Sequence, residues 1–384
     1  MKTIVSILVF FILFCIVVIA HEFGHLLIAK LNGISVQEFT IGFGPKLCGF
    51  HKGGTDYVLR LLPLGGACIF EGEETDPMNT SIKEKADLLL DTEGEGEAPK
   101  KETDLKQLKM KEDFKEEKLL ILDAPVWKRI ATTFAGPLFN FILGLIMAII
   151  IVGFSQEVIP LISSVEENSP AAQAGLMEGD RIIRIDGERV FILPEITLIN
   201  YLNKDHPMDV VYKRDGQKLK TEITPYYDAE TGRYLMGFSG SLVEPGFKTA
   251  IQYGFYEVRY WLHYSVKSLV MLFTGQLSRD EISGPVGMVT MVGDVIEETE
   301  PYGISTTILS LLNFATLVSV NLGVINLLPI PGLDGGKLLF YFIEIVRGKP
   351  VERQKEAIVQ LIGFILLIII MIFVFYNDIA RLFR

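Results

Sequence analysis

The sequence predicts a polytopic α-helical membrane protein with about four spans, a membrane-associated β-hairpin and one extracytoplasmic β domain. Hydrophobic residues make up 49% of its 384 residues and the mean hydropathy is +0.36, which is too apolar for an ordinary soluble enzyme. Crossing a hydrocarbon layer about 30 Å thick takes roughly 20 helical residues. Four apolar stretches are long enough for this, at residues 4–29, 130–154, 304–328 and 357–376.

The first apolar stretch also has features of a secretory signal, because Lys2 precedes an apolar run that ends at the small residue Ala20. The apolar helix resumes after a polar pentad, at residues 26–29. We therefore expect this segment to be retained as a membrane span.

Lysine and arginine near the span ends predict the orientation. Basic residues flank the connection between the first two spans and crowd the connection between the last two, whereas three glutamates within residues 297–300 precede the third span. We expect a multi-pass membrane protein with both termini outside the cytoplasm.

Between the first two spans, residues 39–44 and 57–64 are short, β-prone and rich in glycine, which predicts a hairpin with its turn near Gly53 and Gly54. Open strand edges are not tolerated in lipid unless protein covers them. We therefore expect the hairpin to lean on the helices or to be completed by a partner strand.

Shifts in composition divide the rest of the chain. Residues 71–124 contain 17 acidic residues against nine lysines, which accounts for most of the formal charge of -11 and is typical of a solvated spacer. There is no basic patch, so nucleic acid is not an expected partner. The expected segments are a first span (1–30), the hairpin (31–70), an acidic cytoplasmic insertion (71–125), a second span (126–156), the β domain (157–240), amphipathic interfacial helices (241–300), a third span (301–335) and a fourth span (336–384).

His21, Glu22, Phe23, Gly24 and His25 fit the H-E-x-x-H pattern at the end of the first span. Positions i and i+4 lie on one helix face, so both imidazoles can bind one zinc ion with Glu22 beside them as general base. The alternative is a polar helix end that snorkels, but each ionisable group at depth costs about 2.5–3.5 kcal/mol. Zinc with two neutral imidazoles and two carboxylates has no net charge, so we expect one Zn²⁺ per chain.

Asp334 is the expected third ligand. Under the predicted orientation the first and third spans run in the same direction, so Asp334 and the histidines reach the same depth. A turn residue in Leu-Asp-Gly-Gly is the alternative for Asp334. Pro329 and Pro331 interrupt the helix before it, and the Asn326 amide can both donate and accept hydrogen bonds. Broken backbone at membrane depth is tolerated where it lines a cavity, which here would be the active site.

Four motifs occur in a fixed order along the chain. H-E-F-G-H at 21–25 is followed by G-P-L-F-N at 136–140, by a stretch at 169–187 that looks like part of a PDZ domain, and by N-L-L-P-I-P-G-L-D-G-G at 326–336. In these motifs the chain resembles the site-2 protease family of intramembrane zinc metalloproteases, in its bacterial RseP-type branch with a single PDZ domain. The likeness covers nearly the whole chain.

The resemblance implies zinc bound by His21, His25 and Asp334, with Glu22 as catalytic base. It also implies cleavage of single-span membrane proteins that have already been cut on the outer side, such as anti-sigma factors or remnant signal peptides. The hairpin would offer a strand edge to an unwound substrate, and the PDZ-like domain would either bind a newly exposed peptide C-terminus or block bulky domains. The residues expected to contact substrate are Asn326, Pro329, Pro331, Asn140, Gly65 and Gly66.

Two other functions are compatible with parts of the sequence. A different membrane H-E-x-x-H metalloprotease would take a downstream glutamate as third ligand, but the proline-flanked L-D-G-G and the PDZ-like domain argue against it. An inactive membrane scaffold would use the PDZ-like domain to bind partners, but such a protein has no need for Glu22 beside intact ligands.

Overall fold

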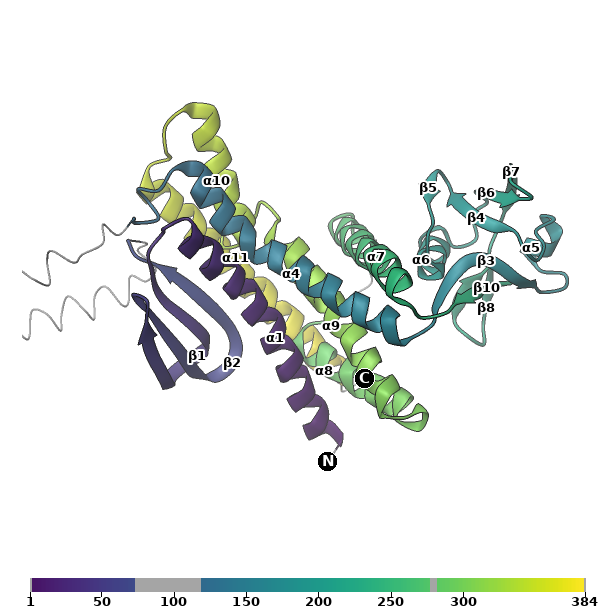
Figure 1. Cartoon of the computed structure of the whole chain (residues 1–384), viewed down its shortest axis with the longest axis horizontal. Helices are drawn as coiled ribbons and strands as arrows, with labels where there is room; N and C mark the ends of the chain where they lie inside the picture. Colours follow the sequence, from purple (N-terminus) through teal and green to yellow (C-terminus); the bar gives the residue numbers. More distant parts are fainter. Residues whose placement is uncertain (1, 73–118, 277–281, 383–384) are drawn as a thin grey trace, which may run out of the picture. The chain divides into compact units, whose positions relative to one another are not determined.

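The computed structural model describes residues 2–72, 119–276 and 282–382 (Figure 1). Within this part of the chain, four helices are long and apolar enough to cross a membrane, which confirms the predicted polytopic fold. The predicted acidic insertion, residues 71–125, lies largely outside the described residues. The four spans are α1 (Lys2–Leu31), α4 (Val126–Phe154), α9 (Ile304–Asn326) and α11 (Arg353–Leu382).

The chain divides into two compact units, which are described separately. The hairpin unit consists of Phe14–Phe139 and Leu327–Leu367. The PDZ unit consists of Met1–Leu13, Asn140–Asn326 and Ile368–Arg384. Helices α1, α4 and α11 each contribute one part to each unit.

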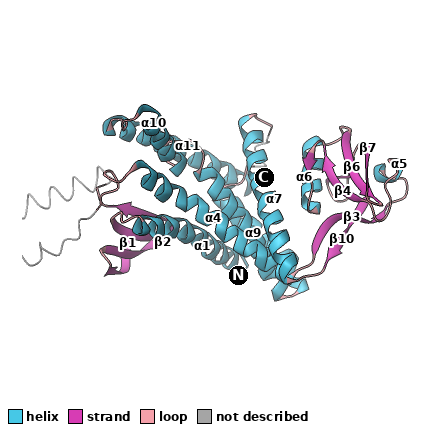
Figure 2. Cartoon of the chain, turned by 45° about the horizontal axis from the view of Figure 1, so that its top comes forward, coloured by secondary structure: helices cyan, strands magenta, loops and turns pink. Residues whose placement is uncertain are grey.

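The β-hairpin of the hairpin unit lies within the predicted segment 31–70, but its two strands are longer than the sequence predicted. Strands β1 (Val36–Lys52) and β2 (Thr55–Phe70) meet at the predicted turn, where Gly53 and Gly54 have φ angles of +57° and +72° (Figure 2). Both angles lie in the left-handed region that glycine adopts without a steric penalty. The strands predicted from the sequence end at positions rich in glycine and proline, whereas β1 and β2 continue through these positions.

One part of β1 pairs with two different segments of β2. Residues 38–41 of β1 pair with residues 56–59 and also with residues 66–69 of β2. The first part of β1 is therefore paired on both sides. A buried apolar cluster joins this sheet to the end of α1 and consists of Leu26, Ala29, Ile34, Val36, Phe39, Phe70, Ile121 and Ala124.

The expected fourth-span segment (336–384) includes residues 336–347, but these belong to a separate helix, α10 (Asp334–Arg347), whose C-cap is Gly348. Its 14 residues are too few to cross a bilayer. Arg129 at the start of α4 anchors α10, because its guanidinium lies 2.5 Å from a Glu344 carboxylate oxygen and 5.0 Å from the Tyr341 ring centroid.

The PDZ unit contains the predicted β domain, a sheet with strand order β10-β3-β4-β6-β7, in which β5 pairs with β4. Asp215 and Gly216 connect β6 to β7, both with positive φ, as a two-residue Asp-Gly hairpin turn requires. The elements are β3 (Glu157–Val165), α5 (Pro170–Gln173), β4 (Arg181–Ile185), β5 (Glu188–Arg189), α6 (Leu193–Asn203), β6 (Met208–Arg214), β7 (Gln217–Ile223), the pair β8 (Tyr226–Asp228) and β9 (Arg233–Leu235), and β10 (Phe238–Val243).

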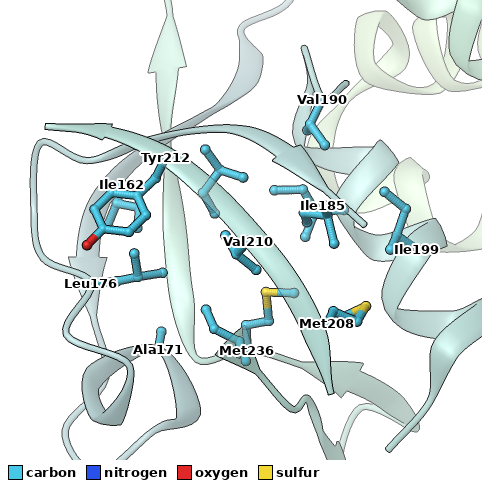
Figure 3. Packing of buried hydrophobic residues seen from close by; sticks show 13 residues of the cluster. Ile162, Ala171, Leu176, Ile185, Val190, Ile199, Met208, Val210, Tyr212 and Met236 are labelled. Carbon is cyan, nitrogen blue, oxygen red and sulfur yellow. The ribbon is translucent and has the colours of Figure 1, made fainter. Parts of the chain in front are cut away.

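Apolar residues of these strands form the core of the domain together with residues of α5 and α6 such as Ala171 and Ile199 (Figure 3). Ile182, Ile185 and Val210 are 0% exposed, and Ile162 is 1% exposed. The one-in, one-out alternation predicted strands in this region because successive side chains point to opposite faces of a sheet.

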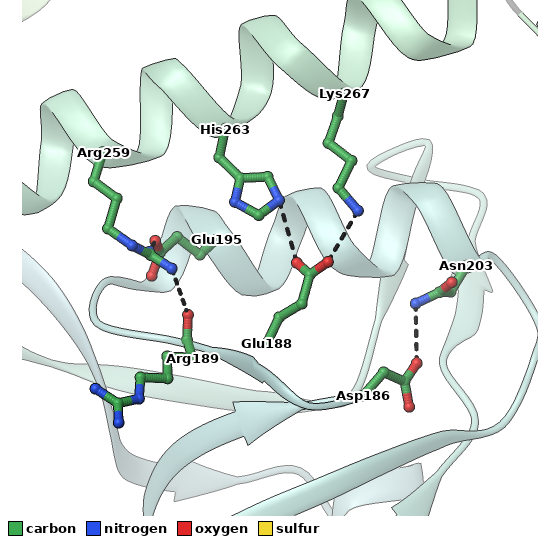
Figure 4. A network of polar contacts seen from close by, with 8 residues as sticks. All are labelled: Asp186, Glu188, Arg189, Glu195, Asn203, Arg259, His263 and Lys267. Atoms are coloured by element: carbon green, nitrogen blue, oxygen red, sulfur yellow. Dashed lines mark hydrogen bonds and ion pairs between the residues drawn. The ribbon is translucent and has the colours of Figure 1, made fainter.

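Helix α7 (Phe247–Phe273) carries the PDZ-like domain through a polar network (Figure 4). Glu188 accepts from Lys267 at 2.9 Å and lies 3.2 Å from His263 Nε2, while Arg259 pairs with Glu195. The Phe191 ring stacks on Tyr256 at 4.4 Å between centroids. The domain is therefore held to α7 by ion pairs and ring contacts together.

Two further elements complete this unit, α8 (Pro285–Thr299) and a short 3₁₀ turn (Glu300–Tyr302). Asp378 of α11 is 2% exposed and accepts the backbone N–H groups of Gly284 and Gly287, each at 2.9 Å. A carboxylate at a helix N-terminus satisfies free N–H groups there. Asp378 thus anchors the start of α8.

The carboxyl groups of Glu157 and Glu257 predict that this unit loses stability as the pH rises. Burial raises the pKa of Glu157 to about 7, and burial with the nearby charges of Glu157 and Glu195 raises the pKa of Glu257 to about 8. The folded state holds these protons more tightly than the unfolded chain does. The protonated carboxyl groups therefore contribute their full stabilisation of the folded state below about pH 4.5, and this contribution is lost as the pH rises through about 8.

We expect the Tm of the purified protein to fall between about pH 5.5 and about pH 8.5. Glu257→Gln should remove much of this slope, on the order of 2 kcal/mol. The exposed Glu178→Gln is the matched control and should leave the slope unchanged. An equal slope in all three proteins would contradict the assignment.

Candidate metal site

His21 and His25 of α1 face one point in the hairpin unit. Their side chains are buried, at 9% and 8% exposed, and the two Nε2 atoms lie 3.2 Å apart. The Nδ1 atom of His25 lies 2.9 Å from the Thr132 carbonyl oxygen of α4. Because a carbonyl only accepts, Nδ1 must carry the proton, and the Nε2 atom of a neutral His25 ring presents a lone pair.

Asp334 is the first residue of α10 and brings a carboxylate to the same point. Its Oδ2 atom lies 3.1 Å from His21 Nε2 and 3.3 Å from His25 Nε2. The two glycines that follow it allow this approach: a Cβ at Gly335 would lie 2.1 Å from the Leu328 carbonyl oxygen, and one at Gly336 would lie 2.5 Å from that of Ile330. The two glycines of L-D-G-G therefore allow the start of α10 to pack closely against the backbone of the loop before it.

The donor set fits a zinc ion. The ligand atoms of His21, His25 and Asp334 all lie within 4.8 Å of one another. An ion bound tetrahedrally at about 2.0–2.1 Å holds its ligand atoms roughly 3.3 Å apart, close to the separations found here. The lone pair of His25 Nε2 also faces a carboxylate oxygen, an arrangement of two acceptors that a cation between them would stabilise.

Glu22 lies next to this cluster and is covered by the hairpin. The backbone N–H of Cys68 in β2 donates to the Glu22 carboxylate. A Cβ at Gly66 would lie 2.9 Å from Glu22 Cγ, and a Cβ at Gly65 would lie 2.5 Å from the Phe43 ring. Gly65 and Gly66, expected from the resemblance to contact substrate, thus also have a packing role.

Gly136 of α4 has a role that the sequence did not indicate. A Cβ there would lie 2.3 Å from His25 Nε2 and 2.8 Å from His21 Cε1. A Cβ at Gly24 of α1 would lie 2.4 Å from the Ala135 carbonyl oxygen, so α1 and α4 approach each other through small residues. The glycine in G-P-L-F-N was visible, but nothing in the sequence alone related it to the histidines.

The other predicted site residues lie on two units. Pro329 is exposed, and Pro331 packs against α11, where a Cβ at Gly363 would lie 2.1 Å from the Pro331 carbonyl oxygen. Asn326, the last residue of α9, and Asn140 of α4 belong to the PDZ unit. Asn140 is 0% exposed and its carbonyl accepts from Ser319 at 2.8 Å. A substrate contact by any of these four residues stays a prediction.

The chain is similar to known proteins over most of its length. The model of a family described as Peptidase family M50 matches residues 9–370. The regulator of sigma-W protease RasP from Bacillus subtilis is 36% identical, over 98% of this chain and 99% of that protein. Zinc metalloprotease RasP from Geobacillus kaustophilus is 35% identical, over 100% and 99%. Among solved structures, the PDZ domain of an SdrC-like protein from Listeria monocytogenes is 24% identical with a TM-score of 0.19, covering 22% of this chain and 88% of that chain.

Proposed function

The chain belongs to peptidase family M50 and is a multi-pass intramembrane zinc metallopeptidase, and we propose that His21, His25 and Asp334 hold its zinc ion while Glu22 is the general base. The observation that carries this assignment is the meeting of two Nε2 atoms and one carboxylate oxygen at separations of 3.1, 3.2 and 3.3 Å. Family membership argues against the alternative of an unrelated membrane H-E-x-x-H metalloprotease.

Bound zinc supplies Lewis acidity, which makes water a nucleophile near neutral pH and polarises the scissile carbonyl. Glu22 accepts the proton of the attacking water and passes it to the leaving amine. The Cys68 N–H holds the Glu22 carboxylate in place, and the Thr132 carbonyl fixes the His25 ring. The hairpin and α4 therefore orient the two groups that the reaction needs.

The proposed substrate is the membrane span of a single-span protein already shortened on the outer side. A helical span hides its carbonyls in hydrogen bonds, so it must unwind before water can attack, and pairing with a strand edge satisfies the exposed backbone. Strand β2 supports this role, because its residues 66–69 pair with β1 and Gly66 lies beside Glu22.

One relative is named a regulator of sigma-W protease, which favours anti-sigma factors as the substrate class of this chain, with remnant signal peptides as the other class. In this proposal both termini and the PDZ-like domain lie outside the cytoplasm, which the basic residues between the spans favour. The PDZ-like domain would there meet the shortened outer end of a substrate, as a carboxylate-binding module or as a size filter.

The test is metal removal and restoration in lipid vesicles that also contain a model single-span substrate. We expect a zinc chelator to abolish cleavage and one equivalent of Zn²⁺ per chain to restore it, because the three ligands form a single site. Mg²⁺ is the matched control and should not restore cleavage, since it prefers oxygen ligands. Cleavage that survives full removal of zinc would overturn the proposal.

A further inference from the structure

A groove of about 570 Å³ lies among α4, α7, α8 and α9 in the PDZ unit. Apolar side chains such as Trp261 and Phe314 form most of its wall. Ser155, Thr306, Ser310 and Asn313 also line it. None of its lining residues, all of which the structure describes, is charged. The groove therefore suits a neutral ligand that is apolar overall but forms hydrogen bonds.

The polar residues follow one face of a membrane span. Thr306, Ser310 and Asn313 are spaced four and three residues apart on α9, so they lie on the same side of the helix. At 1.5 Å per residue, Asn313 lies roughly 13 Å from the start of α9. Its side chain is exposed and forms no hydrogen bond with any residue that the structure describes.

An exposed amide at this depth is costly in hydrocarbon, where polar side chains mark functional positions. A lipid acyl chain would cover the apolar wall but would leave the Asn313 amide without a partner.

We propose that this groove docks the membrane-spanning helix of a substrate, with Asn313 and Ser310 bonding to small or polar side chains on that helix. Helices associate in membranes through close packing of small residues and through hydrogen bonds from Ser, Thr and Asn, which is the chemistry that the groove offers. The inference rests on the proposed function, since it names where the substrate of that protease first binds.

The position of the groove on α9 fits this role. Helix α9 runs on for 13 residues beyond Asn313, roughly 20 Å, and ends at Asn326. The loop that leads to Asp334 begins there. A helix docked along α9 therefore extends toward the end of α9 that leads into the metal-site loop.

Site-specific photo-cross-linking tests the docking directly. Glu22→Gln protein in vesicles would carry a photoreactive amino acid at Ser310 or, as the matched control, at Ile308, which is 51% exposed and lies about 200° around the same helix. We expect the substrate to cross-link at least about five times more strongly from position 310. Equal cross-linking from both positions, or cross-links from 310 to lipid alone, would overturn the proposal.

Kinetics give an independent test that separates the two proposals. Asn313→Leu should raise KM for a full-length substrate span by roughly three- to tenfold, with kcat nearly unchanged, because one interhelical hydrogen bond is lost. The same variant should cleave a short peptide that lacks the docked part at the wild-type rate, and Ile308→Leu should match wild type with both. An unchanged KM with an active wild type rejects the groove, whereas an inactive wild type rejects the proposed function.

Discussion

Glu22→Gln is expected to lower kcat for a membrane substrate by about 10³-fold or more while the protein keeps about one zinc per chain. The amide has almost the size of the carboxylate and can still accept the hydrogen bond from the Cys68 N–H, so packing under Gly66 is preserved. It cannot accept a proton from attacking water. General bases contribute about 10²–10⁴-fold, or roughly 3–5 kcal/mol of the activation barrier.

The measurement pairs metal analysis of the purified variant with cleavage of a single-span substrate in vesicles. Glu352→Gln is the matched control, because that side chain is 72% exposed and pairs only with Lys355 among the described residues. The control should match wild type in both assays. Retention of more than about a tenth of the activity by Glu22→Gln would remove Glu22 from the role of base, and loss of the zinc would make it a ligand instead.

The four spans were predictable because a single physical requirement defines them. A membrane helix must be apolar over roughly 20 residues, and that requirement is local in the sequence. The strands of the PDZ-like domain were predictable for a similar reason: alternation and Asp-Gly turns, as at Asp215 and Gly216, are local signals.

The hairpin and α10 were predicted less well because their extents depend on contacts that are distant in the sequence. Strand β1 continues past Gly44 and Pro45 because its residues 46–52 pair with residues 55–60 of β2, and residues 56–59 also pair with residues 38–41. The second half of the hairpin is thereby held against the first. Helix α10 was assigned to the fourth span, although Asp334 and the two glycines after it start a new helix that packs on its own loop.

The metal site likewise has a part that the sequence predicted and a part that it did not. The spacing of His21 and His25 and the position of Asp334 after a span were enough to predict that the three residues meet. The supporting contacts were not predictable, because the Thr132 carbonyl that orients His25 is backbone and has no sequence signature. Gly136 is a comparable case, since only the packing of α4 against α1 reveals that the histidines occupy the space of its missing side chain.

Asp334→Ala is expected to lower zinc affinity by at least about 100-fold and to abolish cleavage. Substitutions of residues that merely orient a ligand cost about 10- to 100-fold, so loss of a ligand itself should cost at least as much. Without Asp334 the two imidazoles would be the remaining ligands of the proposed set, and both are neutral when they bind a metal. Zinc per chain after dialysis against a weak chelator is the readout.

The variant must be shown to fold, because Asp334 is also in the first turn of α10, where a negative charge stabilises the helix by about 0.3–1 kcal/mol. Asp334→Asn keeps the size of the side chain and should lose zinc as well. Asp294→Ala, an exposed acidic position in α8, is the matched control and should retain it. If Asp334→Asn instead held a full equivalent of zinc with a wild-type Tm, a carboxylate at this position would not be needed to bind the metal, and the third ligand would have to be sought elsewhere.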